Sequence, residues 1–273
     1  MRTSDFIFKE KLGTGAFGAC YLATYKPNQR WYVIKKQSME HVEIVMNEVK
    51  LLSKMEHTNI ITYYGSWIEN NKCFILMEYA TKGTLYNLLS RRQHPLQQRD
   101  ALYLFAQITL GVHHIHKQNV LHRDLKPGNI MLTGQNADVI KIGDFGISKR
   151  INREDAQTRV GTRMYMAPEV LRGHRYGYKC DIWSMGIILY EMLTLKFPFA
   201  SNSHVGMITR ILEMKPSKLP ATVSEDCVRM LSKMLQKDPQ DRPPSRYLVL
   251  CPLLLHSISK VYLNVGRVDR AQC

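Results

Sequence analysis

The sequence has few of the features that indicate a membrane protein, a disulfide-bonded protein or a zinc-binding protein. Its six cysteines show no C-x-x-C or otherwise paired spacing, so neither a zinc site nor disulfides are expected, and a reducing cytoplasm is the natural location. The most apolar segment, 182–195, is too short to cross a bilayer and contains Glu191, which predicts a buried helix and no membrane span. No signal peptide is expected, because only Phe6, Ile7 and Phe8 form an apolar run before charges resume.

Acidic residues are also scarce: 23 Asp and Glu stand against 38 Lys and Arg, which makes the formal net charge +15. A basic excess attracts polyanions such as nucleic acids. The basic residues are scattered, however, with no long block of like charge and no alternation with aromatic residues of the kind that single-strand binders use. We therefore expect no stable nucleic-acid complex.

The most informative stretch is 122–129, which reads His-Arg-Asp-Leu-Lys-Pro-Gly-Asn. This spacing is typical of a phosphoryl-transfer loop, in which Asp124 accepts the proton of a substrate hydroxyl and Asn129 holds a magnesium ion. A loop this short places a carboxylate and a metal-binding amide beside the same phosphoryl group. Lys126 adds positive charge that can stabilise the charge developing on the γ-phosphate. Taken alone, the octet could also be a charged surface turn.

Two further motifs follow in the order that this chemistry requires. Asp144-Phe145-Gly146 begins fifteen residues beyond Asn129, and the Asp144 carboxylate is a second hard oxygen ligand for magnesium. Ala167-Pro168-Glu169 then closes the segment. Together the motifs make an accidental match improbable.

With these motifs the chain resembles the eukaryotic protein kinases, from about Phe6 to about Leu255. The resemblance implies an α+β, bilobal protein kinase fold, with a small β-rich N-lobe and a larger helical C-lobe that share a cleft. We expect an N-terminal extension at 1–5, the N-lobe and hinge at 6–80, the C-lobe at 81–257 and a short basic tail at 258–273. The resemblance also implies ATP and Mg2+ as cofactors and proteins as substrates.

A glycine-rich run at 13–18 reads G-x-G-x-x-G between two strand-like segments. Dinucleotide-binding folds use the same spacing, but a helix should follow the glycines there, and here a strand follows. The run therefore favours the kinase hairpin, whose backbone N–H groups approach the nucleotide phosphates. Cys20 stands where the family has Val. The residues expected to contact the nucleotide are Leu12, Gly13, Thr14, Gly15, Ala16, Phe17, Gly18, Ala19 and Cys20.

The strand-like run Tyr32-Val33-Ile34-Lys35 predicts the lysine that pairs the α- and β-phosphates with a glutamate. Alternation favours Lys35 over Lys36, because Val33 and Lys35 share the face of the strand that we assign to the cleft. Glu48 is the expected partner, since apolar residues surround it with helical periodicity.

The next two strands are expected at 60–64 and 73–79, joined by the turn-forming pair Asn70-Asn71. The kinase resemblance makes Met77 the gatekeeper. It also places the hinge at Glu78 to Ala80, where backbone groups would hydrogen-bond adenine.

Three histidines, His113, His114 and His116, suggest a metal site. No carboxylate or cysteine lies at ligand spacing, so we interpret them as the end of a supporting helix over 100–117. The resemblance further implies that Asp181 caps the backbone of the catalytic loop and that Arg242 pairs with Glu169.

Narrower features resemble the serine/threonine kinases and, among them, the NIMA-related (Nek) kinases. Lys126 and Gly161-Thr162 match the serine/threonine type, and the runs at 141–149 and 189–196 resemble Nek sequences. This implies a role in the cell cycle, centrosome or cilium, with the centrosome, cilium and nucleus as candidate locations beside the cytoplasm. Arg163 stands where Nek sequences usually have Pro, so the family's substrate preference does not carry over.

Three residues are regulatory candidates. Thr158 lies between the Asp-Phe-Gly and Ala-Pro-Glu motifs, where an activating phosphate is expected. Thr162 resembles the structural threonine that bonds the catalytic Asp and Lys. Tyr63 matches a tyrosine that points into the active site in an inactive state of several Nek kinases, with simple core packing as the alternative. Activation by a protein partner is the alternative to phosphorylation of Thr158.

Two rival functions stay open. A pseudokinase scaffold would keep the fold without the chemistry, but the expected phosphate-binding, catalytic and metal-binding residues are all present. A basic module that binds nucleic acid or tubulin could coexist with catalysis. Salt-dependent binding by a catalytically inactive variant would reveal such a module.

Overall fold

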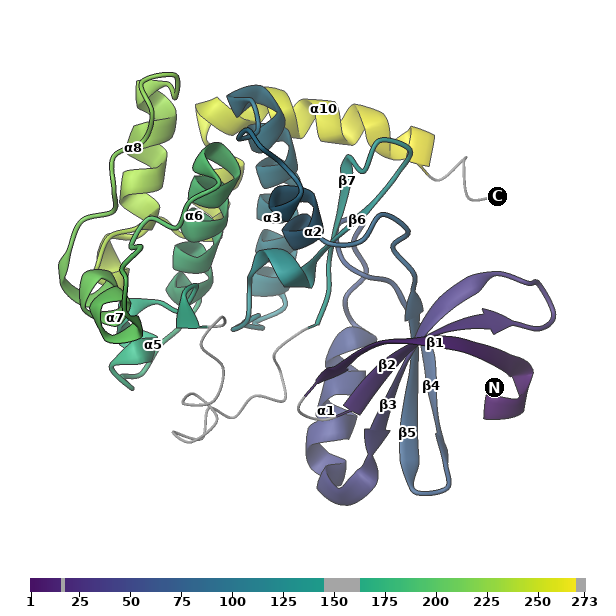
Figure 1. Cartoon of the computed structure of the whole chain (residues 1–273). Helices are drawn as coiled ribbons and strands as arrows, with labels where there is room; N and C mark the ends of the chain where they lie inside the picture. Colours follow the sequence, from purple (N-terminus) through teal and green to yellow (C-terminus); the bar gives the residue numbers. More distant parts are fainter. Residues whose placement is uncertain (16–17, 145–162, 269–273) are drawn as a thin grey trace.

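The computed structural model describes residues 1–15, 18–144 and 163–268. Its N-terminal part is an antiparallel sheet of five strands in the order β1-β2-β3-β5-β4, with helix α1 beside it (Figure 1). A short 3-10 turn at Thr3–Asp5 directly precedes the first strand. The elements are β1 Phe6–Gly15, β2 Gly18–Tyr25, β3 Trp31–Ser38, α1 Val42–Leu52, β4 Tyr63–Glu69 and β5 Lys72–Glu78.

The register of β3 decides which lysine faces α1. Lys35 pairs with Cys20 on β2 and with Ile75 on β5, and directly paired residues of antiparallel strands lie on the same face. Lys36 lies on the other face, where its Nζ is 5.8 Å from the ring centre of Phe74. The alternation in the sequence therefore predicted the correct strand face.

The β4–β5 hairpin turns where expected, but β4 begins later than predicted. Asn70 and Asn71 both adopt positive φ, 50° and 57°, as a type I′ turn requires. The strand expected at 60–64 is wrong in its first part, because Ile60 makes only an isolated parallel bridge to Ile142 and β4 starts at Tyr63. The segment before β4 therefore ties the small lobe to the strand that precedes Asp144.

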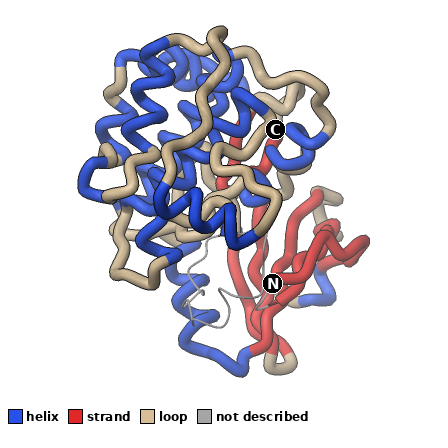
Figure 2. The backbone as a smooth tube through the Cα atoms, turned by 60° about the vertical axis from the view of Figure 1, so that its left-hand side comes forward, coloured by secondary structure: helices blue, strands red, loops and turns tan. Residues whose placement is uncertain are grey.

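The C-terminal part is mostly helical (Figure 2). Its helices pack around α3 (Gln98–Lys117) and α6 (Lys179–Thr194). Only Lys179 and Glu191 of the 16 residues in α6 are not buried, so α6 is the core helix that its apolar run predicted. The remaining elements are α2 Leu85–Ser90, η3 Pro127–Asn129, β6 Ile130–Thr133, β7 Val139–Ile142, α5 Pro168–Leu171, α7 His204–Glu213, α8 Glu225–Met234, η5 Pro239–Asp241, α9 Ser245–Val249 and α10 Pro252–Val268.

The β6–β7 hairpin brings the two predicted metal ligands together. Ile130, the first residue of β6, pairs with Ile142, the last residue of β7. Asn129 and Gly143 therefore lie opposite each other, and the Gly143 N–H donates to the Asn129 carbonyl at 3.0 Å. Asp144 follows directly, so residues fifteen positions apart in sequence meet at one end of the hairpin.

The segment expected to be a basic tail from residue 258 is instead part of α10, which runs to Val268. Ile258 and Val261 are buried in the C-lobe core, which explains why the helix continues past the predicted boundary.

Within the described ranges no single helix is long and apolar enough to cross a membrane. The bent pair of segments Pro239–Val249 and Pro252–Asn264 reaches the length and apolarity of a membrane span only when the two segments are taken together.

Candidate active site

A buried ion pair joins β3 to α1. Lys35 Nζ lies 2.6 Å from Glu48 Oε1, which confirms the predicted pair. Gln37, two residues further on the same strand face, donates from Nε2 to Glu48 Oε2 at 2.8 Å and holds the carboxylate from its other side. Burial opposes the charge on Lys35, but Glu48 and Asp144 outweigh it and raise the pKa of the lysine. Lys35 is therefore charged and positioned for anionic phosphates.

The catalytic loop places three predicted side chains in direct contact. Asp124 Oδ2 accepts from Lys126 Nζ at 2.9 Å and from Asn129 Nδ2 at 3.1 Å. Asn129 Nδ2 also donates to the Asp124 carbonyl at 2.8 Å. These two bonds use the amide nitrogen of Asn129 and leave Oδ1 as its metal-binding atom. The loop thus combines a proton acceptor, a cation and an oxygen ligand, as its spacing predicted.

A buried carboxylate on α6 holds this loop from beneath. Asp181 accepts the backbone N–H groups of His122 and Arg123, both at 3.0 Å, and a ring nitrogen of His116 at 2.9 Å. Burial would raise the pKa of Asp181, but the hydrogen bonds and charges of His116 and His122 outweigh it and lower the pKa. The expected capping role of Asp181 is confirmed.

His122 connects the loop to the metal-binding strand. Its Nε2 lies 3.1 Å from the Gly143 carbonyl, and its Nδ1 lies 3.4 Å from the Asp124 backbone nitrogen. Burial lowers the pKa of His122 despite the nearby carboxylates, so the ring is neutral, with Nε2 as donor and Nδ1 as acceptor. His122 is therefore a packing and positioning residue.

Asp144 lies between the two lobes. Its Oδ1 is 3.9 Å from Lys35 Nζ, and half of its side chain is exposed. Its backbone adopts the left-handed conformation with φ of 48°. The Asp144 carboxylate and Asn129 Oδ1 are hard oxygen donors, which Mg2+ prefers, so the donor set fits the predicted metal. Both would leave coordination positions for phosphate oxygens and water.

The glycine-rich hairpin lies beside the strand that carries Lys35, because β2 pairs with both β1 and β3. A Cβ built on Gly18 would lie 2.1 Å from the Lys36 carbonyl oxygen, so no larger residue fits there without moving the strands. Leu12 is exposed and Cys20 is half-buried opposite Lys35. Ala16 and Phe17 lie outside the described residues. The predicted nucleotide contacts of this hairpin stay predictions.

Glu78, at the start of the predicted hinge, forms an ion pair with Lys141 on β7 that the sequence did not predict. Glu78 Oε2 accepts from Lys141 Nζ at 2.9 Å and from Thr62 Oγ1 at 2.9 Å, and the Glu78 N–H donates to the Thr62 carbonyl. The Glu78 side chain therefore has a structural role, and the predicted contacts of the hinge backbone with adenine stay predictions. Met77 is half-buried and pairs with Val33.

The remaining predicted residues fall into three groups. The Glu169 and Arg242 side chains form the expected pair, with two bonds of 2.7 and 2.8 Å. The histidines serve the packing of α3: His113 and His116 contact Ser245 Oγ at 3.1 and 3.2 Å. The regulatory candidates Thr158 and Thr162 lie outside the described residues.

Tyr63 is described, and its hydroxyl lies 2.9 Å from Ser66 Oγ within β4. The ring is half-buried against the core. Its regulatory role stays a prediction.

A family model described as "Protein kinase domain" matches residues 6–253. The chain belongs to the protein kinase family. It is similar to Serine/threonine-protein kinase Nek5 of Mus musculus, 39% identical over 89% of this chain and 39% of the relative. Serine/threonine-protein kinase nekl-2 of Caenorhabditis elegans is 33% identical over 94% of this chain and 76% of the relative.

A solved kinase structure supports the same assignment. The crystal structure of Rad53 1-466 in complex with AMP-PNP has a TM-score of 0.79 and 26% identity, and covers 92% of this chain and 65% of that chain. The predicted bilobal kinase fold and the resemblance to Nek kinases are thus confirmed. The chain spans only 39% and 36% of the mouse and human Nek5 proteins.

The Glu78–Lys141 pair yields a stability prediction. We expect Lys141→Met to lower the free energy of unfolding by about 3–5 kcal/mol, because it leaves the Glu78 carboxylate buried without its cation. Adding Glu78→Gln should recover part of the loss, since Gln keeps an acceptor for Thr62 without the charge. Urea unfolding measures both. Lys50→Met on the exposed face of α1 is the control, and equal small effects of the two lysine substitutions would contradict the buried pair.

Cys20 yields a second prediction. Burial raises the pKa of its thiol although Lys35 opposes this, so an electrophile on an adenine-like scaffold should label it slowly at neutral pH and faster as pH rises. ATP should protect it, and Cys20→Val should abolish labelling. Mass spectrometry locates the modified residue. Labelling of Cys73, or no protection by ATP, would place the adenine site elsewhere.

Proposed function

We propose that this chain is an ATP-dependent serine/threonine protein kinase. One observation carries the proposal: Asp124, Lys126 and Asn129 form a single contact cluster, and the Gly143 N–H donates to the Asn129 carbonyl. The next residue, Asp144, lies 3.9 Å from Lys35 of the Lys35–Glu48 pair in the other lobe. The membership of the protein kinase family supports it. A pseudokinase scaffold is disfavoured, because the residues are not only present but also mutually positioned.

The proposed reaction follows from these positions. The hydroxyl oxygen of a substrate Ser or Thr attacks the γ-phosphorus, the bond to the β,γ-bridging oxygen breaks, and ADP leaves. Asp124 accepts the hydroxyl proton, while Lys126 stabilises negative charge on the transferred group. Mg2+, when bound through Asp144 and Asn129, would neutralise the β- and γ-phosphates. Lys35, held by Glu48, would orient the α- and β-phosphates.

The finer biological role is also a proposal. Similarity to Nek5, Nek8 and nekl-2 supports a Nek-like function in the cell cycle, centrosome or cilium. The cysteine pattern supports a reducing compartment such as the cytoplasm. Protein substrates follow from the kinase proposal. Arg163, where Nek sequences usually have Pro, supports a substrate preference that differs from theirs.

The decisive test is Asp124→Asn. We expect phosphoryl transfer to a generic protein substrate to fall on the order of 10²–10⁴-fold, because the proton acceptor is lost. ATP binding and the unfolding midpoint should change little, since Asn keeps the shape of the side chain. Transfer of labelled phosphate measures activity, and fluorescence of a nucleotide analogue measures binding. Lys36→Met, on the opposite face from Lys35, is the matched control. Unchanged transfer by the Asn variant would refute the assigned base.

Activation should depend on Thr158. Arg123 is exposed and directly precedes Asp124, and the described part of the chain offers its guanidinium no carboxylate partner. A phosphate on Thr158 adds a charge of about −1.5 to −2 that can pair with Arg123. We expect Thr158→Ala and phosphatase treatment to lower activity, and Arg123→Ala to remove the response, whereas Arg91→Ala should not. Full activity of Thr158→Ala would instead support activation by a protein partner.

A further inference from the structure

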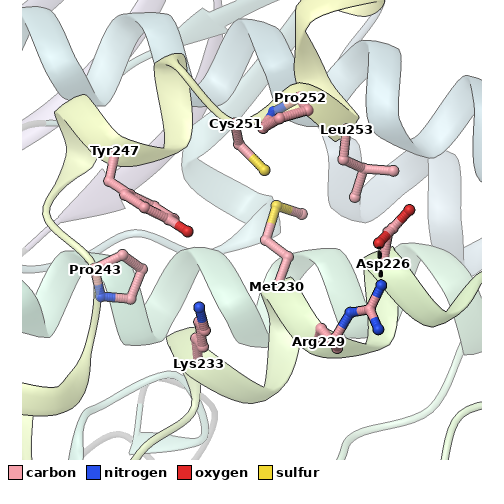
Figure 3. A pocket seen from close by; sticks show the side chains of 9 residues that line it. All are labelled: Asp226, Arg229, Met230, Lys233, Pro243, Tyr247, Cys251, Pro252 and Leu253. Atoms are coloured by element: carbon pink, nitrogen blue, oxygen red, sulfur yellow. Dashed lines mark hydrogen bonds and ion pairs between the residues drawn. The ribbon is translucent and has the colours of Figure 1, made fainter.

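A groove on the C-lobe lies apart from the active site. It runs between α8 and the corner where α9 passes into α10 (Figure 3). In Figure 1, α8 lies at the end of the molecule opposite the five-stranded sheet. A ligand in this groove would therefore leave the nucleotide site open.

The floor of the groove is apolar. Cys251 and Leu253 point from the α9–α10 corner toward Met230 on α8 (Figure 3). Tyr247 closes one end and keeps 49% of its surface exposed, and Leu250, next to the corner, is 70% exposed. Apolar surface gathered in a hollow and rimmed by polar groups is typical of a site that another molecule covers.

The rim of the groove carries positive charge that the protein only partly neutralises. Arg229 pairs with Asp226 at 2.5 Å, so its charge is largely balanced. Lys233 is exposed, and its Nζ lies 5.8 Å from the ring centre of Tyr247. Among the described residues no carboxylate pairs with Lys233. The groove therefore presents an ammonium group directly beside its apolar floor.

The size and charge of the groove restrict its occupant. Its volume is about 230 Å3, below the roughly 300 Å3 at which small-molecule sites begin, so it suits one or two side chains. A second copy of this chain would bring another net charge of +15, and the C-terminal residues of this chain include Lys260, Arg267 and Arg270. Both would be repelled by Lys233. A carboxylate is the complementary group.

We propose that this groove docks a short segment of a protein partner, with an apolar side chain on Met230 and Cys251 and an adjacent Asp or Glu on Lys233. The apolar contact supplies affinity, and the carboxylate supplies orientation and selectivity. The proposal does not depend on kinase activity, because no residue of the groove belongs to the catalytic site.

The test is selection of phage-displayed random peptides of about twelve residues on the immobilised full chain. We expect enriched peptides to combine Leu, Met or Phe with a nearby Asp or Glu. Fluorescence polarisation of the synthetic peptides should show a loss of about tenfold or more in affinity with Lys233→Glu. Lys260→Glu is the matched control, since Lys260 is also an exposed lysine beside a tyrosine ring, at 5.0 Å from the centre of Tyr103.

A second readout locates the peptide independently of the charge change. Cys251 lines the groove and is partly exposed, so a bound peptide should slow its alkylation by a maleimide. Cys20, in the other lobe, should react at an unchanged rate. The proposal is overturned if no peptide is enriched, if affinity is equal for Lys233→Glu and Lys260→Glu, or if Cys251 alkylation is unaffected. Apolar peptides insensitive to Lys233→Glu would equally reject an acidic partner.

Discussion

The Asp181 carboxylate is the constraint on which the active site depends. An ionised carboxylate as deeply buried as this one is tolerated only when hydrogen bonds replace its lost water. Two of its donors are backbone N–H groups of the catalytic loop, and a third is His116 on α3. The loop must therefore take the path that satisfies Asp181. Arg123 accordingly adopts φ of 68°, a conformation that non-glycine residues rarely accept without such compensation.

Further contacts connect the catalytic loop, which Asp181 holds, to residues of both lobes. His122 contacts the Gly143 carbonyl, which sets the position of Asp144, and Asp144 approaches Lys35 on β3. A second route begins at the hinge, where Glu78 binds Lys141 on β7, two residues before Gly143. Asn59 adds a third connection, because its Nδ2 donates to Gln107 on α3 and to the Ile140 carbonyl on β7. The strand β7 is thus bonded to residues of both lobes, and it ends two residues before the metal ligand Asp144.

The sequence predicted the site residues whose positions depend on residues close to them along the chain. The octet at 122–129 identified Asp124, Lys126 and Asn129, because the three side chains meet within one short loop. Alternation identified Lys35, and the same alternation places Gln37 on the strand face of Lys35, beside Glu48. By contrast, Glu78 and Lys141 are far apart in sequence, and nothing local shows which buried charges meet. Lys141 within the apolar strand 139–142 shows only that a partner must exist.

The two wrong boundaries have a similar cause. Ile60 and Ile61 have the apolarity of a strand, but Ile142 supplies their backbone contact, so no regular strand forms there. The residues from 258 onward look like a basic tail because they include Lys260, Arg267 and Arg270, but Ile258 and Val261 are buried in the core. In both places a distant segment decides the structure. The groove beside α8 could not be predicted from the sequence for the same reason, because its residues come from two segments, 226–233 and 243–253, that share no recognisable motif.

The buried ion pairs serve position more than stability. Lys35–Glu48, Lys141–Glu78 and Arg242–Glu169 each join separate elements, and replacing such a pair by apolar residues of similar volume is often neutral or stabilising in proteins. An apolar contact, however, does not define the direction of its partner. Each of these carboxylates accepts more than one donor, which restricts its orientation. Phosphoryl transfer needs that restriction, because misplaced groups lose the advantage of proximity. The buried charges of this fold thus lie where two separate helices, strands or loops must keep a fixed orientation relative to each other.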